Sequence, residues 1–226
     1  MVTIRANTRL AGATLAVACV LSACSGQTFG MKAGSPNRLA QRSADAGDFE
    51  TAAAFYQQAF DANPKSVDAL VGLGRSYAGM GQYARAEQAL MEAKARHPND
   101  PSVQLELART QIGAGKPAEA LANLEPALKK RPRDLQILTA KGIALDRLSR
   151  HAEAQQIYRH GLSLDPTNFI LSSNLGLSLG LSGQSSEAIT ILRELTRDAA
   201  ATANTPGNVA PVYGIAARDK AAPAVI

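Results

Sequence analysis

The sequence contains no tryptophan, and aromatic residues make up only 4% of its 226 positions. A β-sandwich core normally uses more of these large side chains, so the composition disfavours that fold. Alanine and leucine recur instead, within a hydrophobic content of 46%. This mixture favours helices whose backbones pack closely on small side chains. The composition therefore predicts an all-α protein with a core and argues against a disordered chain.

Cysteine is also scarce, since Cys19 and Cys24 are the two in the sequence and both lie near the N-terminus. No disulfide framework or zinc cluster can be built from the residues that follow them. The three histidines are His97, His151 and His160. On one predicted helix, the spacing of His151 and His160 turns their side chains to opposite sides. We therefore predict no metal site and no cofactor.

Charge of one sign is not concentrated in any segment. The formal net charge is +5, and Arg5 and Arg9 contribute two of these charges. Proteins that bind nucleic acids cluster lysine and arginine and place stacking aromatic residues among them. Neither pattern occurs here, so nucleic acid is not a predicted partner.

A hydrophobic run long enough to cross a membrane is missing as well. Residues 10–21 are uncharged and apolar, but a spanning helix needs about 20 such residues. The run follows Arg5 and Arg9, as the apolar part of a signal peptide does. We therefore predict a signal peptide over residues 1–23. A helix that belongs to the fold is the alternative interpretation.

The stretch Leu21-Ser22-Ala23-Cys24 resembles a bacterial lipobox, in which the cysteine is lipidated after cleavage. A competing box that ends at Cys19 lacks the leucine, and an ordinary signal peptide without lipidation is the other alternative. Lipidated cysteines of this kind carry more than one acyl chain, which stable anchoring requires. Ser25, rather than aspartate, follows the cysteine, and this indicates the outer membrane. Residues 24–36 are then predicted to be the lipidated cysteine and a flexible tether.

The remainder of the chain repeats every 34 residues. Prolines recur at one position of the repeat, glycines at a second, with one serine among them, and alanines at a third. These residues are Pro64, Pro98, Pro132 and Pro166; Gly47, Gly81, Gly115, Ser149 and Gly183; and Ala52, Ala86, Ala120, Ala154, Ala188 and Ala222. The period and its punctuation resemble the tetratricopeptide repeat (TPR), which is a pair of antiparallel helices.

Each residue type in this pattern has a physical role. Small residues such as Gly74 and Ala86 let the two helices approach closely, and Gly81 ends a helix in the left-handed conformation. Pro98 cannot continue the second helix. Counting from residue 33, the pattern predicts a TPR solenoid over 37–226 with five clear units and a degenerate sixth. Pro211 and Pro223 interrupt that last unit.

The ninth position of each unit is predicted to line a concave groove. It is occupied by Gln41, Arg75, Arg109, Ile143, Leu177 and Pro211. Arg75 and Arg109 are predicted to lie in adjacent units, with Ile143 and Leu177 beyond them. Such a groove suits a protein partner with acidic and hydrophobic residues, and the alternative is that both arginines are solvated surface residues. The Lys and Asn set of chaperone-docking TPR proteins is not matched, because Val71 and Glu106 stand at the corresponding positions.

Enzymatic activity is not predicted. Residues 176–180 match the Gly-x-Ser-x-Gly pattern of a nucleophile elbow, with Ser178 as the serine. However, no strand precedes this stretch and no histidine follows it, and Gly176 is a helix-packing glycine of the repeat. We therefore predict neither a catalytic residue nor a small-molecule substrate.

Together, the lipobox, residues 174–195 and residues 208–226 resemble one family, the TPR lipoproteins of tight-adherence (Flp/Tad) pilus assembly (TadD-like proteins). The resemblance implies a pilotin-like assembly factor, lipid-anchored at Cys24 on the periplasmic face of the outer membrane. It also implies a partner within the pilus machine, with the outer-membrane secretin as the expected candidate. A pilotin of type IV pili and a TPR lipoprotein adaptor for cell-wall hydrolases are the alternatives.

Overall fold

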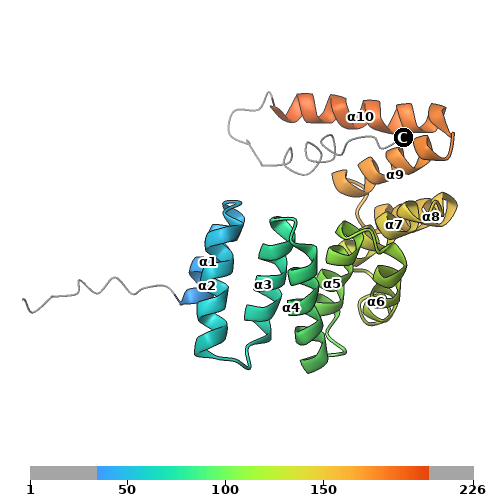
Figure 1. The fold of residues 1–226 in the computed structure, drawn as a ribbon. Coiled ribbons are helices and arrows are strands. Elements are labelled where there is room, and N and C mark those ends of the chain that lie inside the picture. Colours follow the sequence, from blue (N-terminus) through green and yellow to red (C-terminus); the bar gives the residue numbers. More distant parts are fainter. Residues whose placement is uncertain (1–34, 204–226) are drawn as a thin grey trace, which may run out of the picture. The chain divides into compact units, whose positions relative to one another are not determined.

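The computed structural model describes residues 35–203, which form ten α-helices and contain no strand. The helices are α1 (Pro36–Asp45), α2 (Phe49–Ala62), α3 (Val67–Gly79), α4 (Tyr83–Arg96), α5 (Pro101–Gly113), α6 (Pro117–Lys130), α7 (Leu135–Arg147), α8 (His151–Leu164), α9 (Phe169–Leu181) and α10 (Ser185–Ala203). They form five consecutive pairs (Figure 1). The first of them begins at Pro36, the last residue of the predicted tether.

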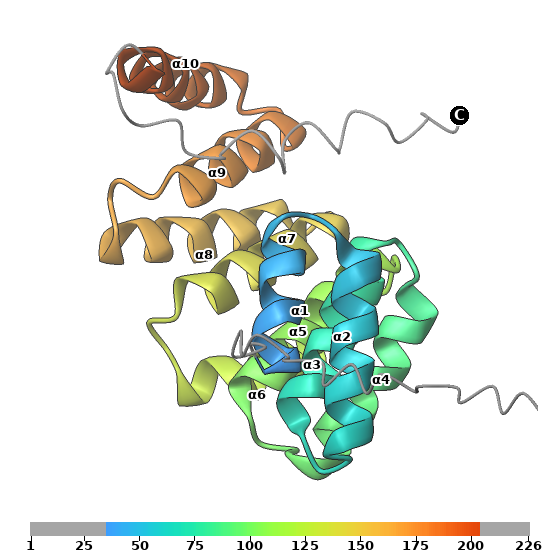
Figure 2. The same ribbon diagram turned by 90° about the vertical axis from the view of Figure 1, so that its left-hand side faces the viewer.

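Each pair packs against the next one along the chain. The two helices of a pair contact each other, and the second helix also contacts the first helix of the following pair. The first helices of successive pairs are in contact as well. Figure 2 looks along this stack, with α1 and α2 nearest the viewer. The predicted all-α solenoid of antiparallel helix pairs is therefore confirmed for the described residues.

The turn inside each pair has the same backbone conformation. Its central residue has a positive φ angle in all five pairs, and these residues are Gly47, Gly81, Gly115, Ser149 and Gly183. The following amide donates to a carbonyl five residues back, as from Gln82 to Tyr77, which is the hydrogen bond of a Schellman motif. The glycines recur every 34 residues in the sequence because this turn requires a residue with a positive φ angle.

Ser149 meets this requirement at a cost, because a left-handed conformation disfavours any residue that has a Cβ atom. Its φ angle is 59°. We expect Ser149→Gly to raise the free energy of unfolding by about 1 kcal/mol, as measured by chemical denaturation. Gly115→Ser is the reverse control and should lower the free energy of unfolding by a similar amount. A Cβ at Gly115 meets no atom within 4 Å, so the backbone conformation alone determines this cost. A destabilising Ser149→Gly would contradict this explanation.

The connections between pairs repeat just as closely. The four predicted prolines all lie in the turn that follows a second helix. Two residues later, a capping side chain accepts a hydrogen bond from a backbone amide of the next helix, as Ser66 does from Ala69 and Asn168 from Leu171. Asp100 and Asp134 occupy the equivalent positions and also cap. Each proline therefore ends one pair and each cap begins the next.

The repeated alanines lie where the two helices of a pair touch. The five that fall in the described residues are at most 5% exposed. Glycine also allows the two helices of a pair to approach closely. A Cβ added at Gly142 on α7 would lie 2.2 Å from Cε1 of Tyr158 on α8. The core is therefore a series of small clusters, each formed by adjacent helices, as expected for a repeat protein.

The last described helix departs from the periodicity. The second helix α8 ends at Leu164, so the 34-residue register places the end of α10 at residue 198. Instead α10 runs to Ala203, because Ala200 stands where a proline ended the earlier pairs. The predicted sixth unit and its alanine, Ala222, lie outside the described residues.

Candidate protein-binding face

The first helices of successive pairs form one continuous surface, called here the first-helix face. α1 contacts α3, and the same contact joins α3 to α5, α5 to α7 and α7 to α9. Within residues 35–203, the second helices of successive pairs make no such contact. A peptide laid along the first-helix face would therefore meet every pair in turn.

The ninth residue of each unit points out of this face. The five such residues that the structure describes are Gln41, Arg75, Arg109, Ile143 and Leu177, and each is exposed or half-buried. In the second to fifth pairs, both chain neighbours of this residue are buried in the stack, as Gly74 and Ser76 are beside Arg75. The predicted residues are thus brought together along one accessible surface, and their role in binding stays a prediction.

Arg75 and Arg109 lie on adjacent helices and share a carboxylate. Nε of Arg75 lies 3.8 Å from Oε2 of Glu106, and Nη1 of Arg109 lies 3.2 Å from Oε1 of the same residue. The Glu106 side chain is only 17% exposed, whereas both arginine side chains are more exposed. Surface ion pairs of this kind are weak. Each guanidinium also has more N–H donors than its contact with Glu106 uses, so an acidic partner can engage the others.

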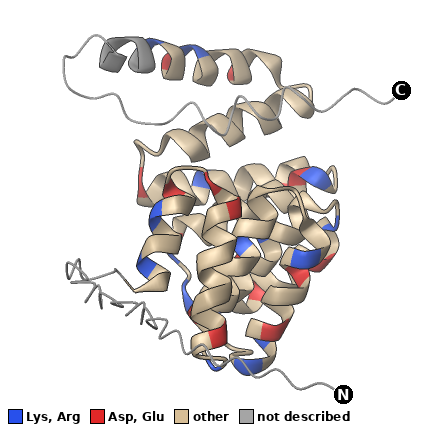
Figure 3. Ribbon diagram, turned by 60° about the vertical axis from the view of Figure 1, so that its left-hand side comes forward, with Lys and Arg blue, Asp and Glu red and all other residues tan. Residues whose placement is uncertain are grey.

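The first-helix face is apolar on its last helix, α9. The helix α9 carries no charged residue and is therefore tan in Figure 3. One side of it packs into the core through Leu171, Leu175 and Leu179. Its exposed side presents Ile170, Leu177 and Leu181, which are 53%, 58% and 68% exposed. Their spacing places these three on one side of the helix.

The ninth-position pattern of the sequence predicts Leu177 on this surface, but it does not predict Ile170 or Leu181. Ile170 occupies the second position of the fifth unit, and Leu181 occupies the thirteenth. At these positions the earlier described units carry exposed polar residues or glycine. Comparing these two positions along the register would have found them, because among the five units of the described residues apolar side chains appear there only in the fifth. The sequence also did not predict that Glu106 pairs with both arginines. It identified Glu106 only as a mismatch to the chaperone-docking residues.

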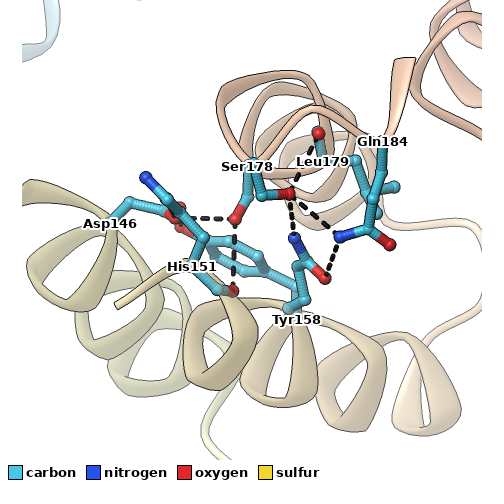
Figure 4. A network of polar contacts seen from close by, with 8 residues as sticks. Asp146, His151, Tyr158, Ser178, Leu179 and Gln184 are labelled. Atoms are coloured by element: carbon cyan, nitrogen blue, oxygen red, sulfur yellow. Dashed lines mark hydrogen bonds and ion pairs between the residues drawn. The ribbon is translucent and has the colours of Figure 1, made fainter. Parts of the chain in front are cut away.

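Ser178 belongs to a polar network between the fourth and fifth pairs (Figure 4). Its hydroxyl donates to Oδ1 of Asp146 at 2.6 Å. The same carboxylate accepts from the hydroxyl of Tyr158 at 2.9 Å and lies 2.8 Å from Nδ1 of His151. The fold therefore brings a serine, an aspartate and a histidine together, which the sequence order had not indicated.

This network does not have the geometry of a catalytic triad. A nucleophilic serine donates to the histidine, and the aspartate orients that histidine from behind. Here Ser178 donates to Asp146 itself and is fully buried. Burial and the nearby carboxylate of Asp146 raise the pKa of Tyr158 well above its ordinary range, so the phenol keeps the proton that it donates. The arrangement joins α7, α8 and α9 and offers no accessible nucleophile.

A second polar network joins the second and third pairs. Lys94 donates to Oδ1 of Asn123. The side-chain amide nitrogen Nδ2 of Asn123 in turn donates to Oε1 of Gln111 at 2.8 Å. Gln111 also contacts Glu87, which pairs with Lys116 at 2.8 Å. The hydrogen bond from Lys116 lowers the pKa of Glu87 below its usual value. Directional contacts of this kind fix how one pair sits on the next.

Within residues 35–203, no helix has the length and apolar character needed to span a membrane. In the same part of the chain, no three His, Cys, Asp or Glu side chains are grouped closely enough to hold a metal ion. Cys24, the predicted lipidation residue, lies outside the described residues, so its modification stays a prediction.

A stack of antiparallel helix pairs that presents the first helix of each pair on one open surface defines a helical-repeat scaffold for protein–protein interaction. Two family models, both described as tetratricopeptide repeat, match residues 43–112 and 105–169. The chain is therefore a tetratricopeptide-repeat protein.

Solved structures show the same fold. A thermophilic TPR protein of Thermus thermophilus has a TM-score of 0.64 and 21% identity, and the match covers 72% of this chain and 89% of that one. MamA of Desulfovibrio magneticus has a TM-score of 0.62 and 18% identity, with 72% and 92% covered. At these identities the likeness concerns the fold alone.

A curated relative matches only part of this chain. It is the uncharacterized protein y4yS of Sinorhizobium fredii, 43% identical over 54 residues. The match spans 24% of this chain and 30% of that protein.

Proposed function

We propose that this protein is a lipid-anchored scaffold for Flp/Tad pilus assembly, which binds a component of the pilus machine through its first-helix face. The TPR fold supports a protein as the partner. The lipobox at residues 21–24 and the resemblance of residues 208–226 to TadD-like proteins support the pilus assignment. The outer-membrane secretin is the proposed partner, because its subunits must cross the periplasm before they insert.

The observation that carries the binding proposal is the difference between two parts of the first-helix face. Arg75 and Arg109 offer guanidinium groups on the second and third pairs, where both contact Glu106. Leu177 and its exposed apolar neighbours on α9 lie on the fifth pair. A partner segment with acidic residues followed at a distance by apolar ones matches both.

The anchor has a separate task in this proposal. A cysteine with more than one acyl chain holds a protein at a bilayer without any spanning helix. Cys24 would then determine location, while the repeats would determine which partner is held there. These two tasks predict that location and recognition can be separated by mutation.

The test is co-purification of the full chain from membranes of a Flp/Tad-producing bacterium, with identification of the proteins that accompany it. We expect the secretin. A second form carries Cys24→Ser behind a conventional cleavable signal, and it should bind the same partner in vitro without bringing it to the outer membrane. If this lipid-free form restores pilus assembly fully from the outer membrane, the anchor is incidental. Recovery of a cell-wall hydrolase or a type IV pilus component instead of the secretin would contradict the pilus assignment.

The binding surface is tested by reversing both arginines in the form that binds in vitro. Arg75→Glu with Arg109→Glu should weaken partner binding roughly tenfold or more, with little change in thermal stability because exposed charges contribute little. The matched control reverses Arg133 and Arg193, which are exposed and lie outside the first helices. Equal affinities of the two variants would move the binding surface elsewhere.

A further inference from the structure

Two side chains at the open end of the stack are more exposed than their equivalents in the earlier pairs. The twenty-fourth residue of the unit is Tyr56, Leu90, Leu124 or Tyr158 in the first four pairs, and each is at most 6% exposed. Leu192 is the equivalent residue of α10, and it is 37% exposed. Three residues before it, Ile189 is 54% exposed, whereas its equivalents Ala53 and Gln155 are buried and Glu87 and Leu121 are half-buried.

The difference has a simple cause in the stack. In the earlier pairs, the first helix of the following pair covers this surface, and α3 lies so close to Tyr56 that a Cβ on Gly72 would be 2.3 Å from its ring. No described helix follows α10. Ile189 and Leu192 therefore occupy a docking surface for one more first helix.

We propose that residues 204–226 of this same chain supply that helix and cover Ile189 and Leu192. The segment follows directly from the end of α10 at Ala203. The helices that fill this position in the stack, α3, α5, α7 and α9, are each 13 residues long, and the segment is long enough for one. A segment tethered at this point competes at an effective concentration of about 1 mM, which favours it over a second copy of the chain.

The sequence of the segment fits the surface. Pro211 suits the first turn of a helix, and Pro223 ends one. Between them, Val212, Ile215 and Ala216 fall on one side of a helix, and an apolar side of this kind matches Ile189 and Leu192. The charged residues 218–220 follow this apolar part. In this proposal the helix begins after residue 203, where the 34-residue register would place its start, because α10 continues to Ala203.

The experiment compares two glutamate substitutions that differ in what should cover them. Ile189→Glu places a charge on the proposed docking surface. Met91→Glu is the matched control, because Met91 is 57% exposed and the equivalent residues of all other pairs are exposed too. In the full chain, we expect Ile189→Glu to lower the denaturation midpoint clearly more than Met91→Glu does. In a chain that ends at Ala203, the two substitutions should have the same small effect.

Hydrogen exchange in the full-length variants tests the inference without relying on the shortened chain. Amides of residues 212–222 should be protected in the unmodified protein, and Ile189→Glu should speed their exchange at least tenfold, while Met91→Glu leaves it unchanged. Equal midpoints and equal exchange in both variants would overturn the proposal. So would a full chain that sediments as a dimer and becomes a monomer with Ile189→Glu, because the occupant would then be a second copy.

Discussion

Replacing Leu124 by alanine is expected to lower the free energy of unfolding by about 2–5 kcal/mol. Leu124 is fully buried in the third pair, in a cluster with Ala108, Ala120 and Ile137. Truncation removes transfer free energy and leaves a cavity that helices held on both sides cannot readily close. Chemical denaturation followed by the helical circular dichroism signal measures the change.

The control is the same substitution on the first-helix face. Leu177 is 58% exposed, so Leu177→Ala should change stability by no more than about 0.5 kcal/mol. Under the proposed function, it should instead weaken binding of the apolar part of the partner. Similar losses of stability from the two substitutions would mean that the assignment of core and face is wrong.

The position of Leu124 also predicts how the protein unfolds. In a repeat stack each pair contacts only its neighbours, and stability is passed along through those interfaces. Damage to the middle pair should therefore weaken the coupling between the pairs on either side. A broader denaturation transition in Leu124→Ala than in the unmodified protein is the expected sign.

The repeat architecture could be predicted from the sequence because its determinants are local. A left-handed turn requires glycine or accepts serine at a cost, a helix end tolerates proline, and a close helix contact requires alanine. Each of these requirements acts within one unit and recurs in the next. Ser149 illustrates this, because it replaces glycine in the series and still has the positive φ angle of the four glycines.

The parts of the site that depend on how one unit faces the next could not be predicted. Glu106 bridges Arg75 and Arg109 because α3 and α5 lie side by side, and the position number alone does not show this distance. Similarly, the chain order placed no histidine after Ser178, whereas packing of α9 on α8 brings His151 close to it. Contacts between units require the stacking geometry.

The second large effect is expected at the carboxylate that collects the polar contacts between the fourth and fifth pairs. Asp146→Ala removes the acceptor of the hydrogen bonds from Ser178 and Tyr158 and the partner of His151. A buried donor left without a partner costs about 1–3 kcal/mol. With two hydroxyls affected, we expect the free energy of unfolding to fall by about 2–5 kcal/mol. Gln136→Ala, an exposed change on the same helix, should leave stability nearly unchanged.

A double-mutant cycle separates the network from a general loss of packing. Ser178→Ala alone removes one hydrogen bond and should cost about 1 kcal/mol, since Ala144 shows that alanine fits the equivalent position of the previous unit. In the Asp146→Ala background, the same change deletes a hydroxyl whose remaining acceptor is the His151 carbonyl oxygen at 3.5 Å, so it should cost clearly less than in the unmodified protein. Additive losses in the double variant would show that the two side chains act independently. Coupling would show that Asp146 holds α9, and with it the apolar end of the first-helix face, in place on the preceding pair.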